Sequence, residues 1–438
     1  MISKRVTGLF PDFSCKDPET EKAFRLAAGG IAANIRVIRD GILPAPAPCL
    51  MAGLDYSQPW TRDAAINVYF CAAVIDPAVA ENTLRCVLRE ENGRITAGGQ
   101  YWDRVIWSLG AWRLWKVTRD RDWLVFARDV IRNTLTDCER DEQDPADGLF
   151  FGAAVYGDGV SAYPEKYRNP DLTSGIIRWP SLHPEAARPV GGGLPMKTLS
   201  LNCVYAETYR VLGEMTAALG EDGSTWLERH DRLCRAINDC FWIPEKQTYT
   251  YLLGEPYAQE SLGLAFALLF GIAGDERAEA VLRNTYIAPA GIPCVWPPYA
   301  PYDSFPGHVG RHSGTVWPHI QGFWALAALR RGRADIFLDE MHLLAAHAVR
   351  DMQFAEIYHP EDSRIYGGMQ EGAGKMIEWR SCSWQTWSAA AYLAMVQDGL
   401  CGLGADGLPE REPLDDERSG PYTLRLSAGG KTPVIIQH

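Results

Sequence analysis

The features that this sequence lacks exclude several classes of protein. Its 43 Lys and Arg residues are outnumbered by 55 Asp and Glu residues, which gives a formal net charge of −12. Nucleic acids and anionic membranes bind proteins through basic patches, and an acidic chain offers little of that kind. No run of about 18 apolar residues suggests a helix that spans a membrane. We therefore expect neither nucleic acid nor membrane as a partner.

The cysteines, histidines and glycines also lack the spacings that mark well-known sites. Eleven cysteines are scattered singly without a CxxC motif, which favours reduced thiols over a disulfide framework. Residues 1–15 have a basic start but no apolar core or cleavage pattern of a signal peptide, so we expect a cytoplasmic protein. His312, His319 and His359 have no HExxH or comparable spacing, and Gly191–Gly193 follow no predicted strand. We expect no metal ion and no cofactor.

Aromatic residues, in contrast, are abundant. The chain has 15 Trp and 18 Tyr residues. Most of them are expected in the core, but aromatic faces also suit sugars, because the apolar C–H face of a sugar stacks on a ring while its hydroxyls bind polar groups. The composition is therefore compatible with a carbohydrate as the ligand.

Apolar residues at steps of three and four predict one helix after another. The expected helices are 18–39, 62–75, 77–89, 101–117, 121–138, 197–219, 224–241, 259–270, 275–285, 314–330, 334–349 and 383–396. Every second helix in this series is apolar on nearly all sides, whereas several of the others keep a charged face. Buried inner helices and half-exposed outer helices would produce this alternation.

The connections alternate as well. Tight links lead from inner to outer helices, and long loops lead from outer to inner helices, so all long loops should gather at one mouth of a ring. We therefore predict an all-α (α/α)6 toroid of six inner and six outer helices, formed by residues 1–400, with its active site at that mouth. In the tail, residues 401–438, the segments YTLRLS and PVIIQ predict a short hairpin.

Several motifs at these loops resemble the (α/α)6 glycoside hydrolases, most closely the clan of family-63 glucosidases and trehalases. The motifs are QPWTRDAAIN, KTLSLNCVYAETY, HSGTVWPHIQGFWALAAL and FAEIYHPEDSRIYGG followed by SCSWQTWSAAAY. The resemblance spans roughly residues 55 to 398. It implies an inverting glycosidase that acts on an α-linked hexoside of glucoside or mannoside type, in an oligosaccharide or a small glycoside.

The resemblance also implies two catalytic carboxylates, an acid before the sixth helix and a base before the twelfth. Glu356 matches the base position, with Glu371 and Glu378 as alternatives. The acid position of the clan falls on Ser161, which cannot act as this acid. We predict that Asp158, three residues earlier in a glycine turn, takes the role, and Glu165 is the second candidate.

Further residues at the starts of inner helices are candidates for binding the sugar. They are Trp60, Arg62, Asp63, Trp102, Asp103, Glu165, Trp317, His319, Gln321, Glu371 and Trp384. Two other functions remain open at this point. A sugar epimerase, isomerase or lyase on the same scaffold would use His312, His319 or His359, and a sugar-binding protein would have lost its acid at Ser161. The oligomeric state is not predicted.

Overall fold

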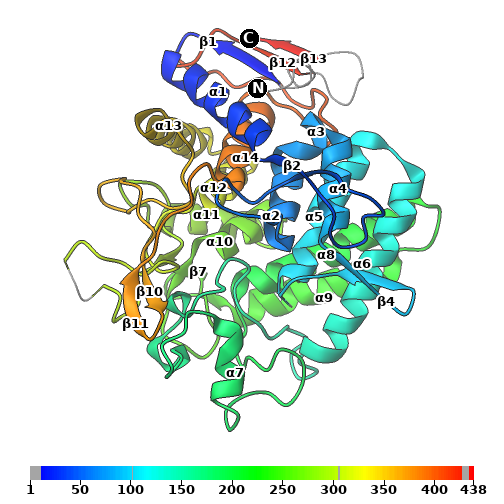
Figure 1. The fold of residues 1–438 in the computed structure, drawn as a ribbon, viewed down its shortest axis with the longest axis vertical. Coiled ribbons are helices and arrows are strands. Elements are labelled where there is room, and N and C mark those ends of the chain that lie inside the picture. Colours follow the sequence, from blue (N-terminus) through cyan, green and yellow to red (C-terminus); the bar gives the residue numbers. More distant parts are fainter. Residues whose placement is uncertain (1–10, 101, 304–305, 427–433) are drawn as a thin grey trace.

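The computed structural model describes residues 11–100, 102–303, 306–426 and 434–438, and helices are its main regular elements (Figure 1). One set of helices forms a closed circle of contacts, in which each helix packs against the next and the last packs against the first. In order, these are α2 (Thr61–Asn67), α5 (Asp103–Thr118), α8 (Leu199–Ala218), α10 (Ser261–Leu269), α12 (Pro318–Arg330) and α14 (Thr386–Ala394).

A second set of helices packs outside this circle. Its members are α1 (Pro18–Ala33), α4 (Pro77–Cys86), α6 (Arg121–Glu142), α9 (Ser224–Cys240), α11 (Asp275–Asn284) and α13 (Ala334–Asp351). Each contacts at least one helix of the circle, as α9 contacts α8 and α13 contacts α12. The contrast in burial matches the sequence pattern: every residue of α10 is buried, whereas α9 buries only Leu233 and Ile237.

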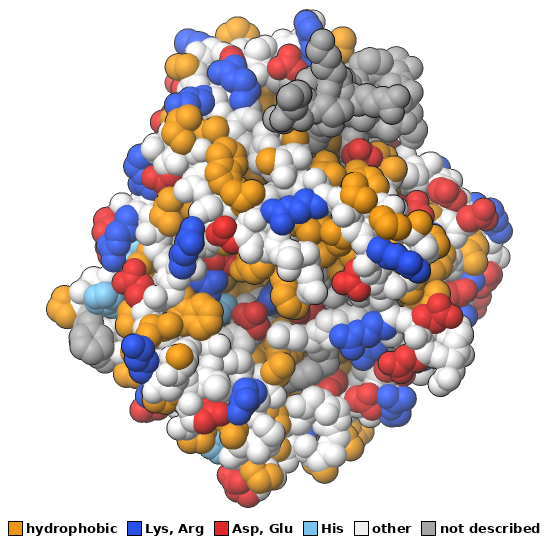
Figure 2. Space-filling view, viewed as in Figure 1, with side chains coloured by type: hydrophobic (Ala, Val, Ile, Leu, Met, Phe, Trp, Pro, Cys, Tyr) orange, Lys and Arg blue, Asp and Glu red, His pale blue; other side chains and the backbone are white. Residues whose placement is uncertain are grey.

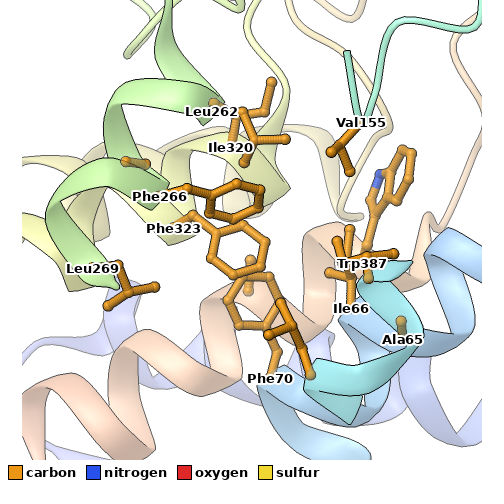
Figure 3. Packing of buried hydrophobic residues seen from close by; sticks show 14 of the residues in the cluster. Ala65, Ile66, Phe70, Val155, Leu262, Phe266, Leu269, Ile320, Phe323 and Trp387 are labelled. Atoms are coloured by element: carbon orange, nitrogen blue, oxygen red, sulfur yellow. The ribbon is translucent and has the colours of Figure 1, made fainter. Parts of the chain in front are cut away.

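Aromatic rings fill the space between the helices of the circle (Figure 3). The ring of Phe323 on α12 lies 4.4 Å from that of Phe70 and 5.0 Å from that of Phe266 on α10, measured between centroids. Phe70 belongs to a π-helical turn, η1 (Val68–Ala72), that separates α2 from α3 (Ala73–Ile75). The three rings join helices that are far apart in the sequence.

The structure corrects two of the predicted helix ends. The first helix ends at Ala33, not at residue 39, and the chain continues as β2 (Ile35–Ile38), which pairs antiparallel with β3 (Ala47–Leu50). The third ends at Cys86, not at residue 89, and is followed by the pair β4 (Leu88–Glu91) and β5 (Arg94–Ala97). β-branched residues in β2 and β5 favour strand over helix.

The predicted C-terminal hairpin is present as β12 (Tyr422–Leu426) and β13 (Val434–Gln437). A strand from the other end of the chain, β1 (Asp12–Cys15), pairs antiparallel with β12 and makes a three-stranded sheet near both termini (Figure 1). The sequence did not reveal this third strand. Its side chains Phe13 and Leu424 are buried in the same core as the helices.

The long loops contain the remaining short elements. These are η2 (Val160–Ala162), η3 (Glu165–Tyr167), η4 (Ile176–Arg178), α7 (Trp179–Leu182), β6 (Trp242–Ile243), β7 (Thr248–Tyr249), β8 (Gln259–Glu260), β9 (Val295–Trp296), β10 (Met369–Gly372), β11 (Lys375–Glu378) and η5 (Met395–Leu400). Acidic and basic side chains are interspersed over the face of the molecule shown in Figure 2. Within the described ranges, no helix is long and apolar enough to cross a membrane.

Candidate active site

A cavity of about 1410 Å³ collects residues from the loops that lead into the inner helices. Its walls include Tyr56 and Trp60 before α2, Asp158 before α8, His312 before α12, and Glu356 before α14. The volume exceeds the range typical of sites for small molecules. The cavity is therefore large enough for a disaccharide or a longer sugar chain.

Glu356 is nearly buried, at 3% exposure, and three donors hold its carboxylate. Tyr56 donates its hydroxyl to Oε1 at 3.0 Å, and Arg311 donates Nη2 to Oε2 at 2.8 Å. The backbone N–H of Cys382 also donates to Oε2, at 3.0 Å. Burial, followed by the charge of Glu356, raises the pKa of Tyr56, so its hydroxyl remains a donor. All these contacts suit an ionised carboxylate, which can accept a proton.

Asp158 lies between the side chains of His312 and Arg62. Its Oδ1 is 3.0 Å from Nε2 of His312, and its Oδ2 is 3.4 Å from Nη2 of Arg62. Burial alone would raise the pKa of Asp158, but the charges of Arg62 and His312 together hold it below its usual value. In the absence of a ligand, the carboxyl group of Asp158 is therefore ionised.

Two further carboxylates line the same cavity at the first turns of inner helices. Burial raises the pKa of Asp63 on α2 well above its usual value, although Arg62 opposes the shift. Burial likewise raises the pKa of Asp103 on α5 to about 7. Asp63 accepts a hydrogen bond from Nε2 of Gln385 at 3.3 Å. Carboxyl groups of this kind can both donate to and accept from sugar hydroxyls.

Aromatic side chains form another part of the wall. Trp60 is 54% exposed and has φ of +51°, a strained conformation for a bulky residue, at the start of α2. Trp317 stacks on His312 with ring centroids 5.0 Å apart and meets Trp387 edge-on at 5.8 Å. Trp60, Trp317, Trp379 and Trp387 all line the cavity, which suits a ligand with apolar C–H faces.

Residues 56–388 match the family described as "Mannosylglycerate hydrolase MGH1-like glycoside hydrolase domain". The chain belongs to this family. It is therefore a glycosidase, as the resemblance to the (α/α)6 glycoside hydrolases predicts. A search of curated proteins finds no match.

Solved structures show the same fold at low sequence identity. The family-63 mannosylglycerate hydrolase of Thermus thermophilus, in complex with glucose, is 20% identical with a TM-score of 0.59; the match covers 84% of this chain and 98% of that one. A sialidase is 14% identical with a TM-score of 0.66. A family-78 rhamnosidase of a Bacillus species is 15% identical with a TM-score of 0.59. This chain spans 40% of the length of each of the latter two, and both matches cover 98% of it.

The cavity of this MGH1-like glycosidase brings together about half of the predicted site residues. Those that line it are Trp60, Arg62, Asp63, Asp103, Asp158, Trp317 and Glu356. The predicted residues outside the lining are Trp102, Glu165, His319, Gln321, Glu371, Trp384 and the alternative base Glu378. Trp102 and His319 are buried beneath the wall, where His319 stacks on Trp387 with centroids 4.1 Å apart.

The other four predicted residues and Glu378 point elsewhere. Glu165 is exposed, and Glu371 is buried between Arg168 and Tyr302. Gln321 on α12 is directed outward, since its Nε2 lies 3.4 Å from the carbonyl of a residue on α13. Trp384 packs against Gly30 on α1, and Glu378 lies 3.7 Å from a histidine of a neighbouring loop. These residues lie close to inner helices in the sequence, but the sequence did not reveal that their side chains point away from the cavity.

Sequence reasoning missed several residues of the site, among them Tyr56, Gln370 and Trp387. Tyr56 holds Glu356, Gln370 bonds to His312, and Trp387 completes the aromatic wall. Tyr56 and Gln370 lie in long loops without a recognisable pattern, so no signal in the sequence pointed to them. Trp387 lies in the first turn of an inner helix, three residues after the candidate Trp384.

Proposed function

We propose that this glycosidase hydrolyses an α-linked hexoside of glucoside or mannoside type, from an oligosaccharide or a small glycoside, with inversion at the anomeric carbon. The observation that carries the proposal is the pair of Asp158 and Glu356, which line one cavity from the loops before α8 and α14. Glycosidases use two such carboxylates, one on each side of the scissile bond.

The contacts of the two carboxylates suit different roles. Glu356, held by Tyr56 and Arg311, accepts a proton from the water that attacks the anomeric carbon. Asp158 delivers a proton to the glycosidic oxygen as the bond to carbon breaks. Asp63 and Asp103 bind hydroxyls of the sugar, and the tryptophans of the wall support its apolar face.

Two observations support hydrolysis over the other functions considered. Ser161, at the position where the clan's acid was expected, is buried and does not line the cavity, whereas Asp158 lines it and supplies a carboxylate from the same loop. Of His312, His319 and His359, only His312 lines the cavity, and it is paired with that carboxylate. An epimerase, isomerase or lyase in which several histidines move a proton from a sugar carbon therefore has less support than a hydrolase.

We propose the domain organisation of the chain from its helix contacts and strand pairing. The circle of inner helices and the helices outside it support an (α/α)6 toroid within residues 1–400, followed by the tail 401–438 with its hairpin. We also propose a cytoplasmic location.

An anomeric NMR assay tests the reaction. The purified protein is incubated with α- and β-linked gluco-, manno- and galactosides, and with α-mannosylglycerate because the matched family and a similar structure carry that name. We expect the β-anomer to appear first from an α-linked glucoside or mannoside. The α-anomer as first product would refute inversion. Exchange of a carbon-bound hydrogen for solvent deuterium, without hydrolysis, would favour an isomerase.

A further inference from the structure

A chain of hydrogen bonds extends from Asp158 into the protein. Nε2 of His312 lies 3.0 Å from Oδ1 of Asp158, and Nδ1 of His312 lies 3.1 Å from Oε1 of Gln370. The hydroxyl of Ser161 donates to the same Oε1 at 2.8 Å and accepts the backbone N–H of His312 at 3.2 Å. A methyl group on Gly159 would lie 1.9 Å from Oε1 of Gln370, so glycine is required beside this chain.

The direction of these bonds fixes where the protons lie. The backbone N–H of His312 can only donate, so the oxygen of Ser161 accepts it and its single proton points to the nearer acceptor, Gln370. An amide oxygen cannot donate, and therefore the short contact to Nδ1 requires a proton on Nδ1. A neutral His312 consequently has a bare Nε2 toward Asp158. The Asp158–His312 contact is then a hydrogen bond only if one further proton lies between them.

We propose that His312, oriented by Gln370 and Ser161, is the positioning residue that stores the proton of the catalytic acid and supplies it to Asp158. The inference rests on the proposed role of Asp158 as the acid. In the free enzyme the shared proton is on Nε2 of His312 and Asp158 is charged. A proton held between two such groups belongs to the pair, and it is available to whichever partner a substrate engages.

The charged groups around the pair have opposing effects on the charge of Asp158. Arg62 and Arg311 favour the charged form of Asp158, while Asp103 and Asp63 face the same cavity with opposite effect. Burial lowers the pKa of the neighbouring His319 well below its usual value, so it adds no competing charge. The ring of His312 stacks on Trp317 and is thereby held in plane.

The proton balance of one turnover is simple. The proton moves from Nε2 of His312 to Asp158, and from Asp158 to the glycosidic oxygen, which leaves as an alcohol. Glu356 takes one proton from the attacking water, whose oxygen forms the new bond to the anomeric carbon. Release of that proton to solvent and uptake of one by the Asp158–His312 pair restore the enzyme.

Kinetics of His312→Gln test the proposal, because glutamine keeps a donor near Asp158 but stores no transferable proton. The substrates are methyl and 2,4-dinitrophenyl α-glycosides of glucose and mannose. We expect kcat/KM to fall about 100-fold on the methyl glycoside, whose leaving group needs a proton, and only about 3-fold on the dinitrophenyl glycoside. The alkaline limb of the pH profile should move to lower pH. His183→Gln, outside the cavity, is the matched control.

Two variants separate this inference from the proposed function. Asp158→Asn should show the same selective loss on the methyl glycoside; if it does not, the acid assignment itself fails. If Asp158→Asn shows the loss while His312→Gln affects both substrates equally and leaves the pH profile unmoved, only the proton store is refuted. Gln370→Glu should move the alkaline limb upward by about one pH unit, because a charge beside Nδ1 holds the proton of the pair more tightly.

A measurement without substrate tests the orientation of the ring. Nitrogen-15 NMR of the histidine rings, with His312 assigned from the His312→Gln spectrum, distinguishes Nδ1–H from Nε2–H. We expect Nδ1 of His312 to keep its proton in both charge states. A neutral form with the proton on Nε2 would refute the proposal whatever the substrate is.

Discussion

Glu356 is distinguished from the other acids of its loop by its donors rather than by its place in the sequence. Asp362 and Glu378 lie in the same loop but are about half exposed at their side chains. Only Glu356 combines burial, contact with the cavity and hydrogen bonds from Tyr56 and Arg311. A base that must bind and activate one water needs such a fixed orientation.

This contrast predicts the effect of Glu356→Gln. The amide keeps the shape of the side chain but cannot take a proton from water, so we expect kcat to fall by about 10³-fold. Binding of the sugar, followed by a ligand-induced thermal shift, should remain. Glu378→Gln, outside the cavity, should retain the rate of the unmodified enzyme. Near-normal turnover by Glu356→Gln would rule out its role as base.

A second prediction concerns a buried acid far from the chemistry. Glu340 on α13 lies beside Gln321 of α12, and burial raises its pKa to about 8. An unfolded glutamate has a pKa of about 4.3. Between these values the folded chain holds a proton that the unfolded chain has released, so this group lowers the stability progressively as pH rises.

Glu340→Gln removes that titration. The difference in melting temperature, variant minus unmodified protein, should therefore increase from about pH 4.5 to about pH 8 and then level off. Glu279→Gln on α11, at an exposed side chain, should show no such trend. A constant difference for Glu340→Gln across the range would contradict the raised pKa.

The residues of the site show which contacts a sequence can reveal. Trp60, Arg62 and Asp63 were predicted because apolar periodicity places the start of an inner helix there, at the mouth of the cavity. Glu356 was predicted because its segment resembles the one that holds the base in the glycoside hydrolase clan. His312 was considered only as a metal ligand or an isomerase base. Its partners come from two different long loops, and irregular backbone carries no periodic signal that would place Ser161 beside Gln370.

At the scale of helices, α12 and α14 approach each other closely at Gly322. A Cβ added at Gly322 would lie 2.7 Å from Cβ of Ala391 and 3.4 Å from the ring of Phe70. Neither neighbour is a flexible chain end. We expect Gly322→Ala to lower the free energy of unfolding by about 1–3 kcal/mol, measured by urea denaturation.

A matched substitution in an outer helix should have the opposite sign. A Cβ added at Gly29 on α1 meets nothing within 4 Å. Alanine there only restricts the unfolded chain and favours the helix, so we expect Gly29→Ala to stabilise the protein by about 0.5–1 kcal/mol. A gain in stability for Gly322→Ala would show that α12 and α14 leave room for a methyl group at this position.

The helices themselves were predictable, but their ends were less so. Apolar periodicity over three or more turns located the helices of the circle and those outside it. The segment 35–38 continued the apolar pattern, yet it forms β2, because its partner β3 competes for its backbone hydrogen bonds. Pairing between segments separated by a loop of Gly and Pro residues cannot be read from one segment alone.

At the scale of the whole molecule, the strands β1 and β12, which lie near opposite ends of the chain, pack onto the helical core. The hairpin of the tail was visible in the sequence, but β1 was not, because its partner β12 lies near the opposite terminus. Phe13 of β1 and Leu424 of β12 are buried in the same cluster as Trp107 of α5 and Trp324 of α12. We expect packing of this kind to make the sheet and the helices unfold as one cooperative unit.

Leu424→Ala tests that cooperativity. Leu424 is fully buried, so its truncation should lower the free energy of unfolding by about 2–5 kcal/mol. Tryptophan fluorescence reports on the helices, and we expect its denaturation midpoint to fall together with that of activity. Ile435→Ala, in the same sheet but 56% exposed, should change the midpoint little. If Leu424→Ala leaves the fluorescence midpoint unmoved, the sheet unfolds apart from the helices, because a residue inside a single cooperative core cannot be truncated without weakening all of it.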